Sequence, residues 1–265
     1  MASFGQLHSM ARTKTLYASV TYLYPVCLTF IMEKGKEFNF EILHRPEFSL
    51  LSVNLEPGQK IKAETGAMVF MDPSMELKTA VKGGLFGGFK RVLARESFFV
   101  NEFSSPKGGR LGLAPIYTGD MAHIAMEAGE RWVVASGGYM ASSLAIDTDS
   151  KFQGFTKGFF SGESMFFLQC SATAPSDLFI AAYGAFEIFD LKPGESLLLD
   201  NGHLVAMEAQ VQFDIRKVGG IKSTIFSGEG LVLNVTGPGK LITQTRSPAG
   251  FLSWVSAHVG GRGRR

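Results

Sequence analysis

Cysteine and charge are both scarce in this sequence. Its 265 residues include only two cysteines, Cys27 and Cys170, and 19% of the residues are charged. Two cysteines exclude a disulfide scaffold and a cysteine-rich zinc module. A net charge of +2 excludes a strongly basic nucleic-acid binder on composition. In contrast, 45% of the residues are hydrophobic and 23 are phenylalanine, so the chain has enough apolar surface to fold around a sizeable core.

The sequence also lacks the motifs that carry catalysis. Its histidines, at positions 8, 44, 123, 203 and 258, form no pair at metal-ligand spacing, and no P-loop, nucleophile elbow or dinucleotide fingerprint occurs. His203 lies near Asp200 and Glu208, which allows acid–base chemistry but is more typical of a histidine that ties down a turn. Cys170 lies in an apolar run, which predicts a buried, inert thiol. We therefore expect no enzymatic activity, no metal and no cofactor.

Residues 1–32 contain no acidic residue, and their apolar run from Leu16 to Met32 is interrupted by Pro25. The run is shorter than the ~20 apolar residues that a transmembrane helix needs, and no signal-peptidase site follows it. Three interpretations stay open: a true start at Met32, a targeting segment, or a weak membrane anchor. This segment carries +2 and the final six residues carry +3. Because the whole chain has +2, the remainder is mildly acidic, at −3.

Glycines and acids recur along the chain at a nearly constant interval. Gly58, Gly129 and Gly194 follow similar turn sequences and are 71 and 65 residues apart. The same spacing separates Gly66, Gly137 and Gly202, and three acids, Glu96, Glu163 and Glu229, recur 67 and 66 residues apart. This period predicts three repeats, at 33–109, 110–176 and 177–247, between the extension 1–32 and a C-terminal segment 248–265 with a basic tail.

Each repeat has the pattern of β structure. Val211–Ile215 alternates apolar and polar residues, and Leu231–Val235 and Phe98–Phe103 are runs of β-branched or aromatic residues. The best helix candidate is the short segment Phe251–Val259. We predict an all-β fold of three tandem β-sandwich repeats around a pseudo-threefold axis.

Several segments of the third repeat resemble one family, namely Gly184–Phe186, Leu191–Glu195, Asp200–Ala206, Phe226–Gly230, Thr236–Gly239 and Gln244–Arg246. They are similar to the mitochondrial-biogenesis altered-inheritance-of-mitochondria family, over roughly residues 40–255, and the stretch 252–254 looks like the end of its prokaryotic members. The resemblance implies three β-sandwich units, each similar to a subunit of the tryptophan RNA-binding attenuation protein. The family's mitochondrial members are associated with inner-membrane organisation. We expect a cytoplasmic protein, or one peripheral to a membrane, and a mitochondrial one if the source is eukaryotic.

Glycine- and phenylalanine-rich segments are the best candidates for function. We predict that they contact an anionic membrane surface or a protein partner through Lys82, Leu85, Phe86, Phe89, Lys90, Arg91, Lys157, Phe159, Phe160 and Lys222. The alternative is that these segments are hairpins whose aromatic side chains fold inward. The chain is thus predicted to be a non-enzymatic scaffold or binding protein, with a small-ligand or RNA-binding module as the alternative. The acidic body disfavours nucleic acid, and homo-oligomerisation is left open.

Overall fold

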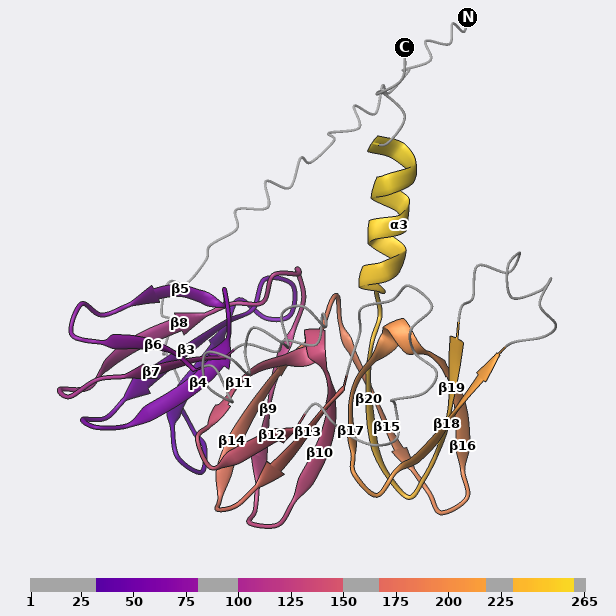
Figure 1. Cartoon of the computed structure of the whole chain (residues 1–265), viewed down its shortest axis with the longest axis horizontal. Helices are drawn as coiled ribbons and strands as arrows, with labels where there is room; N and C mark the ends of the chain where they lie inside the picture. The colour runs from indigo at the N-terminus through magenta and orange to yellow at the C-terminus, as the bar shows by residue number, and fades with distance from the viewer. Residues whose placement is uncertain (1–31, 81–99, 150–166, 218–230, 260–265) are drawn as a thin grey trace, which may run out of the picture. The chain divides into compact units, whose positions relative to one another are not determined.

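The structure is a computed structural model that describes residues 32–80, 100–149, 167–217 and 231–259. All of them belong to one compact unit, Met32–Arg265. These ranges contain twenty strands, one α-helix and two short 3-10 helices (Figure 1). The registered strand pairs are antiparallel, and the predicted all-β class is confirmed.

The strands form four sheets. The first sheet contains, in spatial order, β1 (Glu33–Lys34), β2 (Asn39–Leu43), β3 (Leu50–Leu55), β8 (Gly109–Leu113) and β5 (Met68–Met71). The second contains β6 (Glu76–Ala80), β7 (Val100–Ser104), β4 (Lys60–Glu64), β11 (Tyr139–Ser143), β14 (Ser176–Ala181) and β9 (Met121–Met126). The third contains β12 (Ile146–Asp149), β13 (Phe167–Ala172), β10 (Arg131–Ala135), β17 (Leu204–Glu208), β20 (Gly239–Gln244) and β15 (Phe186–Leu191). The fourth contains β16 (Ser196–Asp200), β19 (Leu231–Thr236) and β18 (Gln212–Lys217).

Three hydrophobic cores lie between successive sheets. The first core joins side chains of the first and second sheets, the second core those of the second and third, and the third core those of the third and fourth. The two inner sheets are therefore covered on both faces. Along β10, Trp132 belongs to the second core and its neighbour Val133 to the third. This double burial explains why β10 and β14 are continuous apolar runs rather than alternating ones.

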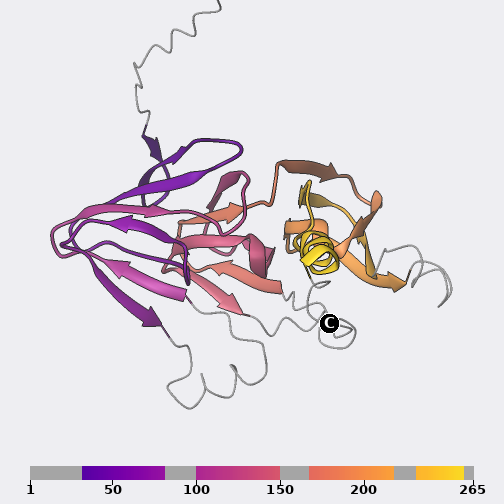
Figure 2. The ribbon, with the colours of Figure 1, turned by 90° about the horizontal axis from the view of Figure 1, so that it is seen from above.

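Three sets of six consecutive strands, β3–β8, β9–β14 and β15–β20, share one neighbour order. In each set the first, sixth and third strands are neighbours in one sheet, and the second, fifth and fourth are neighbours in the next (Figures 1 and 2). These sets run over residues 50–113, 121–181 and 186–244. The predicted boundaries after residues 109 and 176 fall inside β8 and β14 and need correction, because spacing reveals a period but not where each unit begins. The pseudo-threefold axis stays a prediction.

The glycines that mark the period lie at equivalent turns. Gly58, Gly129 and Gly194 have φ angles of +83°, +91° and +80°, which residues with a Cβ adopt only under strain. The N–H of Gly58 donates to the carbonyl of Ser105, and that of Gly129 donates to the carbonyl of Ala172, both at 2.8 Å. These glycines therefore fix the turn that leads into the second strand of each set.

Candidate functional site

The predicted contact residues lie outside the described part of the chain. This holds for Lys82, Leu85, Phe86, Phe89, Lys90, Arg91, Lys157, Phe159, Phe160 and Lys222, and also for the acids Glu96, Glu163 and Glu229. The prediction that they meet a membrane or a partner stays a prediction. A functional surface must therefore be sought among the described residues.

Three loops join side by side to form a platform. Phe48 and Gly119 form one β-bridge, and Gly119 and Gly184 form another. Gly119 permits this close approach, because a Cβ at this position would lie 2.0 Å from the carbonyl oxygen of Ala182. The platform brings together segments from the first two strand sets with the start of the third.

An ion pair fixes the first of these loops. Arg45 donates through Nε and Nη2 to the two carboxylate oxygens of Asp120, at 2.8 and 3.0 Å, and Ser49 Oγ donates to Asp120 Oδ1 at 3.2 Å. Although burial opposes ionisation, the hydrogen bonds from Arg45 and from the Met121 backbone N–H keep the pKa of Asp120 below its usual value. The bidentate pair holds the loop in place while the side chain of Phe48 stays exposed.

A row of aromatic rings extends from the platform along the C-terminal helix. Tyr117 lies 5.2 Å from Tyr183, and Tyr183 lies 6.1 Å from Phe251. Phe251 stacks on Trp254 at 6.5 Å, and Trp254 lies 4.6 Å from His258. These distances are within the range of favourable ring–ring contacts. We call Phe48, Ile116, Tyr117, Tyr183, Phe251, Leu252 and Trp254 the aromatic surface.

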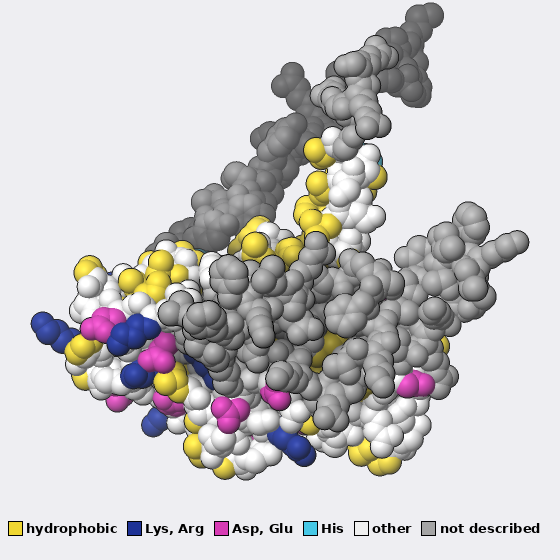
Figure 3. Space-filling view, viewed as in Figure 1, with side chains coloured by type: hydrophobic (Ala, Val, Ile, Leu, Met, Phe, Trp, Pro, Cys, Tyr) yellow, Lys and Arg dark blue, Asp and Glu magenta, His cyan; other side chains and the backbone are white. Residues whose placement is uncertain are grey.

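The helix that carries the end of this surface is α3 (Pro248–Val259). Ser247 caps it, since its Oγ accepts a hydrogen bond from the N–H of Gly250, and Pro248 occupies the first turn. None of its residues is buried, and it contains no lysine, arginine, aspartate or glutamate. Hydrophobic side chains gather along it in Figure 3. The helix predicted at 251–259 is confirmed, but its role as a surface was missed; the signal was an apolar, uncharged segment.

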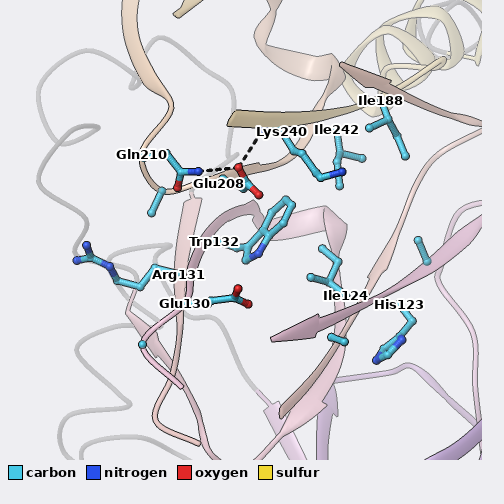
Figure 4. A pocket seen from close by; sticks show the side chains of 14 residues that line it. His123, Ile124, Glu130, Arg131, Trp132, Ile188, Glu208, Gln210, Lys240 and Ile242 are labelled. Carbon is cyan, nitrogen blue, oxygen red and sulfur yellow. Dashed lines mark hydrogen bonds between the residues drawn. The ribbon is translucent and has the colours of Figure 1, made fainter. Parts of the chain in front are cut away.

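A groove of about 580 Å³ lies where β9 faces the third sheet (Figure 4). Its apolar lining includes Trp132, Ile188 and Ile242, and its polar lining includes Glu208 and Lys240. Glu208 Oε2 accepts hydrogen bonds from the Gln210 amide at 2.6 Å and from the Lys240 backbone N–H at 3.0 Å. The carboxylate at the rim is therefore already engaged within the protein.

The two candidate catalytic side chains have structural surroundings. His203 Nδ1 donates to the backbone carbonyl of Gln244 at 2.7 Å, and Asp200 caps the turn by accepting from the Gly202 N–H at 2.8 Å. Hence His203 ties down the turn and is not bonded to a carboxylate. Cys170 is fully buried, and burial raises the pKa of its thiol to about 12, which confirms the predicted buried, inert thiol.

Asp177 is a fully buried carboxylate at the start of β14. It accepts hydrogen bonds from the backbone N–H groups of Lys36, Glu37 and Phe38 at 2.7, 2.8 and 2.9 Å. His123 Nε2 donates to it at 2.8 Å. Burial disfavours the charged form, yet these hydrogen bonds together lower the pKa of Asp177. The carboxylate joins the segment before β2 to the second sheet.

Glu64 is a second unusual carboxyl group, at the end of β4. Burial raises its pKa to about 7, because the charged form loses its hydration. Within the described ranges, no group of three or more His, Cys, Asp or Glu side chains is placed to hold a metal ion. The same ranges contain no helix long and apolar enough to cross a membrane.

Comparison with known proteins identifies relatives of this chain. The sequence model of the family described as "Mitochondrial biogenesis AIM24" matches residues 40–246. An uncharacterised protein of Streptococcus pyogenes serotype M6, M6_Spy0233, is 26% identical over 228 residues, covering 83% of this chain and 90% of the relative. A crystal structure of protein SPYM3_0169 from Streptococcus pyogenes matches with a TM-score of 0.69 at 22% identity, over 83% of this chain and 99% of that one. The structural match extends to the fold alone.

Proposed function

The chain belongs to the mitochondrial biogenesis AIM24 family, and we propose that it is a non-enzymatic binding protein that acts at a membrane surface. The observation that carries this proposal is the aromatic surface. It ends in a helix without charge and without a buried residue. A helix that is apolar on most sides is expected to be covered, and nothing in the described part of the chain covers α3 beyond its start.

The chemistry of this surface suits the boundary between lipid headgroups and acyl chains. Trp254 is 60% exposed and Phe251 is 45% exposed, and tyrosine and tryptophan prefer such interfaces because one end of the ring is apolar and the other polar. Complete burial of a large apolar side chain contributes about 1.5–3 kcal/mol, so several partly exposed ones support reversible binding. With twelve residues, α3 is about 18 Å long and suits an interfacial position better than a spanning one.

Cations near α3 favour an anionic surface. Arg246 precedes the helix, and Arg262, Arg264 and Arg265 follow it in the sequence. Each cation close to an anionic bilayer adds roughly 1 kcal/mol, and the attraction weakens with salt. The glycine- and phenylalanine-rich segments would add further contacts if they reach the same surface.

Two alternatives have less support. A small ligand in the groove would have to compete for Glu208, whose carboxylate already has two donors. RNA is disfavoured by the net charge of −3 between residues 33 and 259, and a fold does not transfer function. The likeness of each unit to a subunit of the tryptophan RNA-binding attenuation protein stays a prediction.

The membrane proposal predicts salt-sensitive binding to vesicles of phosphatidylglycerol and phosphatidylcholine. Trp132 is 6% exposed, so a shift of tryptophan emission to shorter wavelength on vesicle addition would report Trp254. We expect co-sedimentation at low salt, and a loss of at least tenfold in the bound fraction for a Phe251→Ser, Leu252→Ser, Trp254→Ser variant.

Ile188→Ser is the matched control, because Ile188 is an exposed apolar residue on β15 outside the aromatic surface. It should bind vesicles like the wild type. Equal binding by the triple variant, or no binding by the wild type at low salt, would contradict the proposal. Thermal melts of each variant show whether the fold is kept.

A further inference from the structure

Each inner sheet is built from two strand sets that meet at one strand pair. In the second sheet, β4 of the first set pairs with β11 of the second, with Ala63 opposite Ala141. In the third sheet, β10 of the second set pairs with β17 of the third, with Val134 opposite Ala206. Moving along the chain by the spacings 71 and 65 converts the first pairing into the second. The two junctions therefore have the same register.

Two strands that correspond to junction strands have a free edge. β5 corresponds to β11 and β17, but its neighbour in the described chain is β8 alone. β16 corresponds to β4 and β10, but its neighbour there is β19 alone. Moreover, β5 has the same register shift against its neighbour as β11 and β17 have, after the first residue of the strand. The equivalence of the three strands thus includes their irregularity.

Side chains on β5 are exposed where their equivalents are buried. Val69 is 56% exposed and Phe70 40%. The corresponding pairs on the junction strands are 0–1% exposed and belong to the core of the preceding strand set: Met140 and Ala141 on β11 in the first core, and Val205 and Ala206 on β17 in the second. Val69 and Phe70 therefore have the form of side chains that complete a core belonging to another strand set.

The opposite end of the strand succession shows the complementary gap. Leu197 and Leu199 of β16 are only partly buried against the third core, whereas Ile61 and Ala63 of β4 are fully buried in the first. Leu198 is 63% exposed, whereas its equivalent on β10, Val133, is 1% exposed. The third core thus lacks the pair of side chains that a following strand set supplies to the first and second cores.

We propose that these two edges bind each other between two copies of this chain. β5 of one copy lies antiparallel to β16 of a second copy, with Phe70 opposite Leu199 and Met71 opposite Leu198. Val69 and Phe70 then close the third core of the second copy. The same register places Asp72 opposite Leu197 and Asp200 opposite Val69, so no two like charges are directly opposed.

A second copy fits these edges better than the chain's own opposite end does. The first and fourth sheets are separated by the second and third, and β5 and β16 lie at opposite ends of the succession of sheets (Figure 1). Because the two surfaces differ, the contact is head-to-tail, and each added copy leaves one free edge of each kind. Such a contact produces rings or longer assemblies rather than a closed two-fold dimer. Unpaired apolar strand edges favour this kind of pairing.

Two charge substitutions test the proposal in solution, in the absence of vesicles. Val69→Lys blocks the β5 edge and Leu198→Lys blocks the β16 edge; both side chains are exposed, so the fold should persist. Light scattering coupled to size-exclusion chromatography should show concentration-dependent assembly of the wild type. Each variant alone should be a monomer. A one-to-one mixture should form a dimer that grows no further, because each variant retains the edge that the other lacks.

Leu77→Lys is the control, since Leu77 is an exposed leucine on β6, an outer strand whose equivalents β12 and β18 are also outer strands. It should assemble like the wild type. A monomeric wild type up to about 100 µM would overturn the proposal, as would assembly of either single variant or a mixture that stays monomeric. Cooperative melts of the variants at the wild-type temperature show that loss of assembly is not loss of folding.

Discussion

Replacing Asp177 with alanine is expected to lower the free energy of unfolding by about 3–5 kcal/mol at pH 7. The substitution removes the shared acceptor of three backbone N–H groups and of the His123 side chain. Buried donors without an acceptor lose their hydration without replacement. The measurement is denaturant unfolding of the full chain. Asp190→Ala is the control: Asp190 is 75% exposed in its ion pair with Lys240, and such pairs contribute 0–1 kcal/mol.

The effect of Asp177 should also depend on pH in a defined direction. The pKa of Asp177 in the folded state lies below the ordinary value of 3.8. A carboxyl group with a lowered pKa stabilises the protein fully above its unfolded-state pKa and loses that contribution as pH falls through the folded-state value. The wild type and Asp177→Ala should therefore differ most at neutral pH and converge below about pH 3.8. A difference that stays constant down to pH 2 would show that the carboxylate's charge is not what stabilises the fold.

Gly35 belongs to the same contact. A Cβ at this position would lie 2.5 Å from both carboxylate oxygens of Asp177, closer than nonbonded atoms approach. Gly35→Ala should destabilise in the same direction by about 1–3 kcal/mol, because it displaces the segment that donates the three hydrogen bonds. In a double variant the two losses should not add, since both act on one interaction.

Local features of the fold were predictable from the sequence. Turn glycines, apolar runs bounded by polar turns and an uncharged helical segment near the end depend on residues within a few positions of each other. Accordingly, the predicted strand 231–235 is found as β19, the predicted strand 211–215 lies within a residue of β18, and the helix is found as α3. The family read from the motifs of the third repeat is confirmed for residues 40–246.

Long-range features were not predictable in the same way. Asp177 accepts from Lys36, 141 positions away, and neither residue carries a local signal for the other. The distribution of each strand set over two sheets also has no local signal, because a continuous apolar run fits any doubly covered strand. The aromatic surface joins Phe48, Tyr117, Tyr183 and Phe251 from distant segments, so single-residue exposure cannot be read from composition. For these reasons the functional prediction from sequence centred on the glycine- and phenylalanine-rich segments and overlooked α3.

Replacing Glu64 with glutamine is expected to stabilise the protein at alkaline pH. The folded-state pKa of about 7 is raised from an ordinary value of 4.5. Such a group favours the folded state below its unfolded-state pKa, and this contribution is lost as pH rises through the folded-state value. A shift of this size corresponds to about 2–3 kcal/mol. Glutamine has nearly the shape of the protonated acid and cannot ionise, so it removes this loss.

The position of Glu64 explains why burial is the dominant cause. It is opposite Val100 in β7 and follows Ala63, which is opposite Ala141 at the junction with β11. The Glu64 carboxylate also helps to raise the pKa of Tyr139, a fully buried residue of β11. The carboxyl group therefore lies beside a core rather than in open solvent. Ionisation there costs hydration that no described cation restores.

Denaturant unfolding between pH 5 and pH 8.5 tests the prediction. The wild type should lose stability across this window, whereas Glu64→Gln should stay nearly flat, so that the two curves separate by about 2–3 kcal/mol at the alkaline end. Histidines titrate in the same range, but they are common to both proteins and cancel in the difference. Glu76→Gln, at an exposed position on β6, should follow the wild type. Parallel curves for wild type and Glu64→Gln would mean that Glu64 is ionised and hydrated in the folded protein.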